Sequence, residues 1–310
     1  MRGTPMKQGV ALFAAVCLTA FYASGLYADA PLAAGGFWSC LAAAAVILLN
    51  SALLSFTNTR ISAHSNIYVS FVYIALVAVN PYALRWTLAH PASLFLLISI
   101  ILYLAYCAEK PSMEYLSGAF FMLGTSGLLL PQLLWLFPIL LLSSIGKSED
   151  KLKYIVTAVI SLLLPMLIFG GICYIRHGID DTLAAFSGMW EKMSGISMQD
   201  FRLSAASLCR ILLAVIATVT AFVYIVRHLT VYKTVQFLAY IRILVLTLAI
   251  CLIALLFNED GLVPYELIIS IPITLLLGEY FINSGDRRGK NILIAILILM
   301  FIAERISLFL

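Results

Sequence analysis

The sequence predicts an all-α protein that crosses a membrane many times, as a polytopic transmembrane helical bundle of 10–11 spans with a short or broken helix pair near residues 115–146. Hydrophobic residues make up 63% of the 310 residues and charged residues only 11%, whereas a soluble domain is about a quarter charged. Nearly the whole chain consists of apolar segments, most of them close in length to the roughly 20 residues that a helix needs to cross a ~30 Å hydrocarbon layer. We therefore expect residues 1–310 to form a single transmembrane domain.

Eleven apolar segments are candidate spans, and the first follows a weakly basic flank like that of a signal peptide. That segment is too long for a signal peptide and lacks a good cleavage site, so we expect it to be retained. The predicted limits are Gln8–Ala28, Gly36–Phe56, Asn66–Tyr82, Pro91–Cys107, Tyr115–Gly124, Leu128–Ile145, Leu152–Ile175, Ser204–Val226, Thr234–Phe257, Leu262–Ile282 and Asn291–Leu308.

The fifth and sixth segments are each short for a membrane crossing. They flank Gly124-Thr125-Ser126-Gly127, where we expect the helix to break. Backbone groups freed by a break must be buried in protein or line a wet cavity, because lipid offers no hydrogen bonds. We expect the floor of any buried site to lie here.

Positive charges indicate the orientation. If the N-terminus is cytoplasmic and the short pair counts as two crossings, twelve basic residues fall inside and four outside, as the positive-inside rule requires. Counting the pair as one unit would place two basic loops outside, so eleven spans are favoured over ten. The inside set is Arg2, Lys7, Arg60, Lys110, Lys147, Lys151, Lys153, Arg227, Lys233, Arg287, Arg288 and Lys290, and the outside set is Arg85, Arg176, Lys192 and Arg202.

One long loop, at about residues 177–203, falls outside on this topology. Within it Leu183, Phe186, Trp190 and Met193 recur at helical spacing, which predicts an amphipathic helix. That helix lies either on the outer membrane surface or over the bundle as a lid.

Arginines inside the spans are candidate site residues, because ionisable groups in a membrane are costly and often mark function. Arg242 lies about eight residues inside its span, with Gln236 and Tyr240 nearby to solvate it, and Arg210 lies about six residues below the outer end. Either side chain could instead snorkel to the membrane boundary along its own stem.

Charged residues near the outer surface predict a polar vestibule suited to a phosphate-linked substrate. Arginine binds phosphate bidentately, and a carboxylate can take a proton from an acceptor hydroxyl, although loops between spans are polar in any case. The residues concerned are Asp29, Arg85, His90, Arg176, His177, Asp180, Asp181, Glu191, Asp200, Arg202, Arg210, Glu259, Asp260 and Glu266.

Several stretches resemble an uncharacterised family of multi-pass inner-membrane proteins of Bacteroidota, defined by a domain of unknown function. They include Ser117-Gly118-Ala119-Phe120 and Ile271-Pro272-Ile273, the latter followed by Glu279-Tyr280-Phe281. This resemblance implies a bacterial inner-membrane location and supplies no activity. The short pair followed by a basic loop also looks like the membrane core of type C glycosyltransferases, in which an acidic residue of the first outer loop serves the reaction. Here that position is matched by Asp29.

Three functions follow as hypotheses. The first is binding or processing of a polyprenyl-phosphate sugar or glycan at the outer face, with Asp29 as acid or base and Arg85, Arg210 or Arg242 as phosphate clamps. The second is a non-enzymatic membrane subunit or assembly factor, and the third is a secondary transporter with Arg242 as its intramembrane charge. Membrane lipids and membrane proteins are the expected partners. We expect no nucleic acid, cofactor or metal, because the chain lacks nucleotide-binding and metal-ligand motifs and carries no soluble basic patch.

Overall fold

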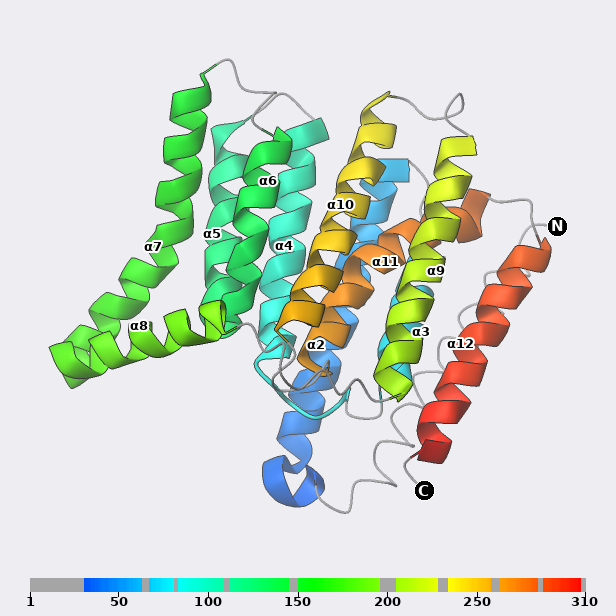
Figure 1. Ribbon diagram of the computed structural model, residues 1–310, viewed down its shortest axis with the longest axis horizontal. Coiled ribbons are helices and arrows are strands. Elements are labelled where there is room, and N and C mark those ends of the chain that lie inside the picture. The colour runs from blue at the N-terminus through cyan, green and yellow to red at the C-terminus, as the bar shows by residue number, and fades with distance from the viewer. Residues whose placement is uncertain are drawn as a thin grey trace. The chain divides into compact units, whose positions relative to one another are not determined.

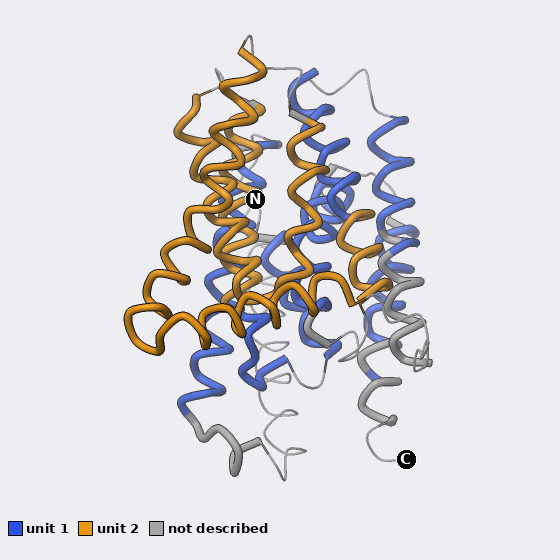
Figure 2. The backbone as a smooth tube through the Cα atoms, turned by 60° about the vertical axis from the view of Figure 1, so that its left-hand side comes forward, with its two compact units in different colours: residues 1–90, 202–247, 260–310 blue, residues 91–201, 248–259 orange. Residues whose placement is uncertain are grey.

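The computed structural model describes residues 31–62, 67–80, 83–108, 112–144, 150–195, 205–227, 234–257, 263–283 and 287–307. All secondary structure in these ranges is helical, which confirms the predicted all-α transmembrane bundle (Figure 1). The first predicted span, Gln8–Ala28, lies outside the described residues. The chain divides into two compact units (Figure 2): residues 1–90, 202–247 and 260–310 form unit 1, and residues 91–201 and 248–259 form unit 2.

Unit 1 is built around one central helix. The elements are α2 (Pro31–Ser62), α3 (Ile67–Val79), α9 (Ala205–Arg227), the first part of α10 (Thr234–Leu256), α11 (Val263–Asn283) and α12 (Arg287–Ser307). Helix α11 packs against α2, α3 and α9, and every residue from Ile271 to Tyr280 is buried. A helix that is apolar on all sides belongs in the interior of a bundle, so the sequence of α11 suits its central place.

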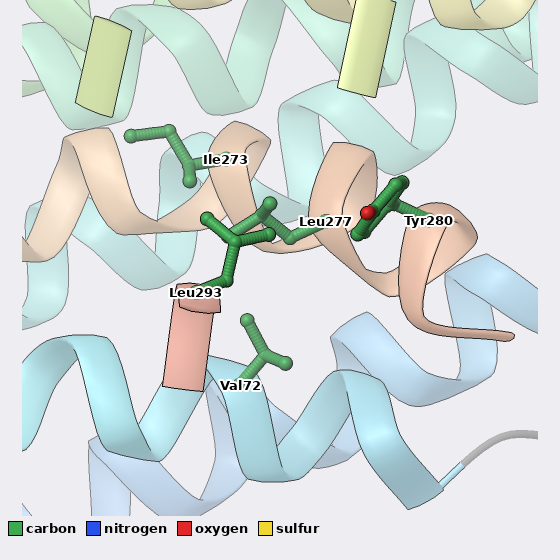
Figure 3. Packing of buried hydrophobic residues seen from close by; sticks show 5 residues of the cluster. All are labelled: Val72, Ile273, Leu277, Tyr280 and Leu293. Atoms are coloured by element: carbon green, nitrogen blue, oxygen red, sulfur yellow. The ribbon is translucent and has the colours of Figure 1, made fainter. Parts of the chain in front are cut away.

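The core of unit 1 joins α11 to α3 and α12. Figure 3 shows Ile273, Leu277 and Tyr280 of α11 near Val72 of α3 and Leu293 of α12, all at most 5% exposed. Gly278 lets the backbones of α3 and α11 approach closely, because a Cβ atom there would meet Val69 Cγ2 at 2.5 Å. Small residues at such contacts are typical of membrane helix pairs.

Unit 2 contains the remaining helices. They are most of α4 (Ala89–Ala108), α5 (Met113–Leu129), the 3₁₀ helix η1 (Pro131–Trp135), α6 (Leu136–Ser144), α7 (Lys151–His177), α8 (Ile179–Ser194) and the end of α10. Hydrogen bonds fix the directions of the short pair. The Ser126 hydroxyl near the end of α5 donates to the carbonyl of Ala92 at 3.0 Å, whereas Ser143 at the end of α6 bonds Tyr103 at 2.6 Å. Because these contacts lie at opposite ends of α4, α5 and α6 run antiparallel.

The short helix pair breaks at Leu130, six residues after Gly124, where the predicted break begins. Residues 124–127 are helical within α5, and the chain leaves the helix at Leu130, which has extended dihedral angles (φ −134°, ψ 92°). Proline disfavours the α conformation of the residue before it, so Pro131 accounts for the break. The expectation of a break at Gly124–Gly127 was therefore wrong.

The two glycines instead allow close packing. A Cβ atom at Gly124 would collide with the backbone carbonyl oxygen of Leu162 in α7, and one at Gly127 would collide with the side chain of Leu134 in η1. Next to these contacts, the Ser161 hydroxyl of α7 donates to Ser117 of α5 at 2.9 Å. The α5–α7 contact is thus a small-residue interface of the kind that packs membrane helices.

Four helical segments of the described chain are long and apolar enough to cross a membrane: Trp38–Thr59, Ala89–Cys107, Lys151–His177 and Thr234–Leu256. Shorter apolar helical segments lie at Val69–Val79, Pro131–Ser143 and Thr218–Arg227. The protein is therefore a multi-pass membrane protein. Among the described residues, Cys40, Cys107, Cys173 and Cys251 are free thiols.

Candidate functional site

Among the described residues, the one buried acidic side chain is Glu279, on the central helix α11. It is 1% exposed, and its Oε2 accepts a hydrogen bond of 2.6 Å from the hydroxyl of Tyr240 on α10, which is also 1% exposed. Burial of an ionised carboxylate is costly unless hydrogen bonds replace its lost hydration. The pair joins two helices through residues 39 positions apart in the sequence.

A second polar contact continues from this pair toward the ends of the helices. Gln236 precedes Tyr240 by four residues and so shares its face of α10. The Gln236 amide donates at 2.9 Å to the carbonyl of Ile61, next to the last residue of α2. The last carbonyls of a helix have no partner within that helix, so Gln236 satisfies one of these groups. The end of α2, the start of α10 and the end of α11 thus meet at one end of unit 1.

Two of the four predicted site residues, Arg85 and Arg242, have side chains that the structure describes. Asp29 lies outside the described residues, and Arg210 lies on α9 with its side chain also outside them. Arg85 is exposed on the loop between α3 and α4, and Arg242 is half-buried on α10. Among the described residues, no hydrogen bond or ring contact links Arg85 with Arg242.

Tyr240 and Gln236 both have partners other than Arg242. Arg242 follows Tyr240 by two residues, which places it about 200° further around the helix. The side chains predicted to solvate this arginine instead bind Glu279 and Ile61. Arg242 therefore lies on a different face of α10 from the buried polar contacts.

His90 has a structural role in the loop that carries Arg85. It is 1% exposed, and its Nε2 lies 2.8 Å from the carbonyl oxygen of Ala83. Since a carbonyl only accepts, Nε2 carries the proton, and Nδ1 is free to accept from the backbone N–H of Thr87 at 3.2 Å. The ring also stacks on Trp86 with centroids 5.5 Å apart. His90 thus holds the loop through Ala83 and Thr87, on either side of the exposed Arg85. The sequence predicts instead that His90 lines a vestibule.

In unit 2, the second half of α7 differs from the first half in how far its residues are buried. From Tyr154 to Pro165, buried residues of α7 recur at helical spacing toward α5, but from Met166 to His177 no residue is buried. Pro165 lacks the N–H that would bond the carbonyl of Ser161, and α7 bends along its length (Figure 1). The second half of the helix is therefore only partly covered by its neighbours within the described residues.

Helix α8 follows α7 directly and runs crosswise to α5 and α6 (Figures 1 and 2). Gly178, with φ +86°, makes the turn between them. The ring of Phe186 contacts Phe169 of α7 edge to face at 6.4 Å, and Trp135 of η1 donates to the carbonyl of Met193 at 3.1 Å. The helix predicted within residues 177–203 thus packs against α7 and η1 along one side.

The outer side of α8 remains apolar and exposed. Ile179, Leu183 and Trp190 are 61%, 62% and 65% exposed, and their spacing of four and seven residues puts them on one face. Exposed acidic residues, Asp180, Asp181 and Glu191, occupy other faces. Such a division of apolar and charged faces suits a helix at a membrane surface.

Sequence reasoning missed the Glu279–Tyr240 pair. Glu279 stands four residues from the end of its helix, where a carboxylate is ordinarily read as a boundary residue. An acidic residue within a predicted span was an available signal.

In the described part of the chain, no group of three or more His, Cys, Asp or Glu residues is placed to hold a metal ion. No protein-family model, curated protein or solved structure significantly matches this chain.

Proposed function

We propose that the protein binds an amphiphilic, lipid-linked substrate of the polyprenyl-phosphate sugar class at the membrane boundary, on the surface formed by α8 and the second half of α7. The observation that carries the proposal is the change in α7 at Pro165. Beyond it the helix is unburied among the described residues, and α8 crosses the same end of unit 2 with a large apolar face exposed.

The chemistry of this surface suits both parts of such a molecule. Leu167 and Ile175 of α7 are 69% and 83% exposed and offer contact to a long apolar chain. Arg176 and His177, at the α7–α8 corner, are exposed and can approach a phosphate, for which arginine has matching donor geometry. Trp190 is the kind of side chain that anchors at the level of lipid head groups.

The resemblance to type C glycosyltransferase cores favours the same substrate class. The resemblance assigns acid or base chemistry to Asp29 and phosphate binding to Arg85, Arg210 or Arg242, none of which belongs to α7 or α8, whereas the surface proposed here offers Arg176 and His177. The location that goes with this proposal is a bacterial inner membrane, with the N-terminus cytoplasmic and α8 outside. Sugar transfer itself would be a further step beyond binding.

The proposal is tested by photo-crosslinking in lipid nanodiscs. A photoreactive polyprenyl phosphate should label peptides from residues 166–194, and unlabelled polyprenyl phosphate should compete far better than phosphatidylglycerol or phosphatidylethanolamine. Trp190→Ala should weaken labelling several-fold, and Arg176→Gln should remove the preference for the phosphate over the free prenol.

Trp38→Ala provides the matched control, since Trp38 is 76% exposed on α2 of unit 1. This variant should label like the wild type. If bulk phospholipids compete as well as polyprenyl phosphate, the surface holds only surrounding lipid, and the proposed function is wrong.

A further inference from the structure

Two polar side chains of the 3₁₀ helix η1 lie on the side that faces α8. Gln132 and Trp135 are three positions apart, and side chains at this spacing eclipse one another in a 3₁₀ helix. The indole N–H of Trp135 donates to the backbone carbonyl of Met193 in α8 at 3.1 Å. Gln132 therefore shares the face of η1 that α8 crosses.

Gln132 carries an acceptor that the described residues leave unused. Its Oε1 atom is buried and has no hydrogen-bond partner among them. Most buried polar atoms in proteins are hydrogen-bonded, and an unpaired one costs free energy. Because a carbonyl oxygen only accepts, a group that binds to it has to carry an N–H or O–H donor. An ionised phosphate has no such donor, whereas a sugar has several.

Helix α8 covers η1 without burying any of its own residues. At one end Gly178 joins it to α7 with φ +86° and ψ −176°, a combination that is essentially restricted to glycine. In the middle, Phe186 lies against Gly170, where an added Cβ atom would meet the ring at 2.9 Å. At the other end Met193 accepts the bond from Trp135. An element with few buried contacts opens readily, so this end of α8 can lift and free the Trp135 N–H.

The length of α8 decides how large a head group has to be to reach η1. The proposed function places the phosphate at Arg176 and His177, next to the first residue of α8. Met193 lies 14 residues beyond that first residue, about 21 Å at the rise of an α-helix. One sugar attached to the phosphate spans only a fraction of this distance, whereas a chain of several sugars covers it.

A sugar unit matches both polar groups of η1. Its hydroxyls can donate to Gln132 Oε1 and accept from the Trp135 N–H. The Trp135 side chain is 46% exposed, and an indole offers an apolar surface beside its polar N–H. The two side chains thus suit the far end of a glycan better than they suit a phosphate or an acyl chain.

We propose that Gln132 and Trp135 form the distal subsite for an oligosaccharide head group, and that α8 is a strap whose Met193 end lifts to admit it. This inference rests on the proposed function, because it takes the phosphate at the α7–α8 corner as the fixed end of the substrate. It adds that the substrate carries several sugar units and that a single sugar does not reach the subsite.

Competition against the photoreactive polyprenyl phosphate in nanodiscs tests the subsite. The competitors are polyprenyl phosphate, the same lipid with one hexose, and the same lipid with a hexose oligosaccharide about 20 Å long, the distance set by α8. The oligosaccharide lipid should compete several-fold better than the other two. Gln132→Leu should remove this advantage and leave competition by polyprenyl phosphate unchanged. This variant should melt no lower than the wild type, because leucine buries no unpaired acceptor.

A covalent tether tests the strap. In a cysteine-free background, Gly170→Cys and Phe186→Cys joined by dibromobimane should hold α8 on α7. The linked protein should lose the oligosaccharide advantage and keep the affinity for polyprenyl phosphate, whereas the same double variant before linking should retain both.

The outcomes separate this inference from the proposed function. If the three lipids compete equally, if one hexose gives the full advantage, or if Gln132→Leu retains it, the distal subsite is wrong while binding of polyprenyl phosphate stands. An advantage that survives the tether would overturn the strap. If bulk phospholipids compete as well as polyprenyl phosphate, the proposed function fails, and the subsite fails with it.

Discussion

The glycines of this chain differ in whether their surroundings leave room for a side chain. At Gly124 an added Cβ atom would collide with the carbonyl oxygen of Leu162 and approach the Pro165 ring at 3.2 Å. A backbone carbonyl cannot rotate away as a flexible side chain can. At Gly171, further along α7, an added Cβ atom would meet nothing within 4 Å.

Gly124→Ala should therefore destabilise the protein by about 1–3 kcal/mol, the usual cost of overpacking a close contact. Gly171→Ala should be neutral or stabilising, because alanine favours the helix over glycine by about 1 kcal/mol. Thermal unfolding in one detergent, followed by circular dichroism, measures both variants. Equal melting temperatures for the two would show that α5 and α7 do not approach at Gly124.

The sequence predicts polar partners mainly between residues that are close along the chain. Those predictions were wrong where the true partner lies on another helix or across a loop. Tyr240 was expected to serve Arg242 because they are neighbours in sequence, but its hydroxyl bonds Glu279 on another helix. His90 was expected to face an outer vestibule, but the loop folds back so that Ala83 and Thr87 bind both ring nitrogens. Neither pairing can be read from spacing alone.

At the scale of helices, the pairing of α3 with α11 depends on complementary shapes at one point. Gly278 receives Val69, whose branched side chain has little rotational freedom within a helix. An alanine at position 278 would compress Val69 Cγ2, and an alanine at position 69 would relieve that compression.

The double-mutant cycle of Gly278→Ala and Val69→Ala tests this contact. The first change alone should cost about 1–3 kcal/mol, and the double variant should be more stable than the sum of the single effects by roughly 1 kcal/mol. Chemical unfolding in detergent micelles measures all four proteins. Strictly additive effects would mean that the two positions are not in contact.

The short helix pair shows what sequence patterns resolve at this scale. Its existence and its position near residues 115–146 were predicted correctly, because two short apolar blocks were visible. The place of the break was predicted wrongly, since glycine was read as a helix breaker although it also permits close helix packing. Pro131 was the better signal, because the residue before a proline tends to be extended, as Leu130 is.

For the whole molecule, the distribution of basic residues predicts the direction of each crossing. Helix α7 offers a direct test, because Lys151 at its start and Lys192 beyond its end are both exposed. The predicted orientation places Lys151 in the cytoplasm and Lys192 outside.

In a cysteine-free background, Lys192→Cys should react with a membrane-impermeant maleimide added to intact cells. Lys151→Cys should react only after the membrane is opened. The opposite pattern would invert the topology. Equal labelling of both positions in intact cells would mean that α7 does not cross the membrane.

The sequence by itself determined the all-α class, the multi-pass membrane character and the approximate limits of the described helices, because a bilayer demands long apolar segments whatever surrounds them. Only the tertiary structure decided which faces are buried. Within a membrane protein both lipid-facing and interior positions are apolar, so hydropathy does not distinguish the central helix α11 from the largely uncovered α7. Tertiary packing buried Glu279 beside Tyr240 and left the end of α7 and the outer face of α8 exposed.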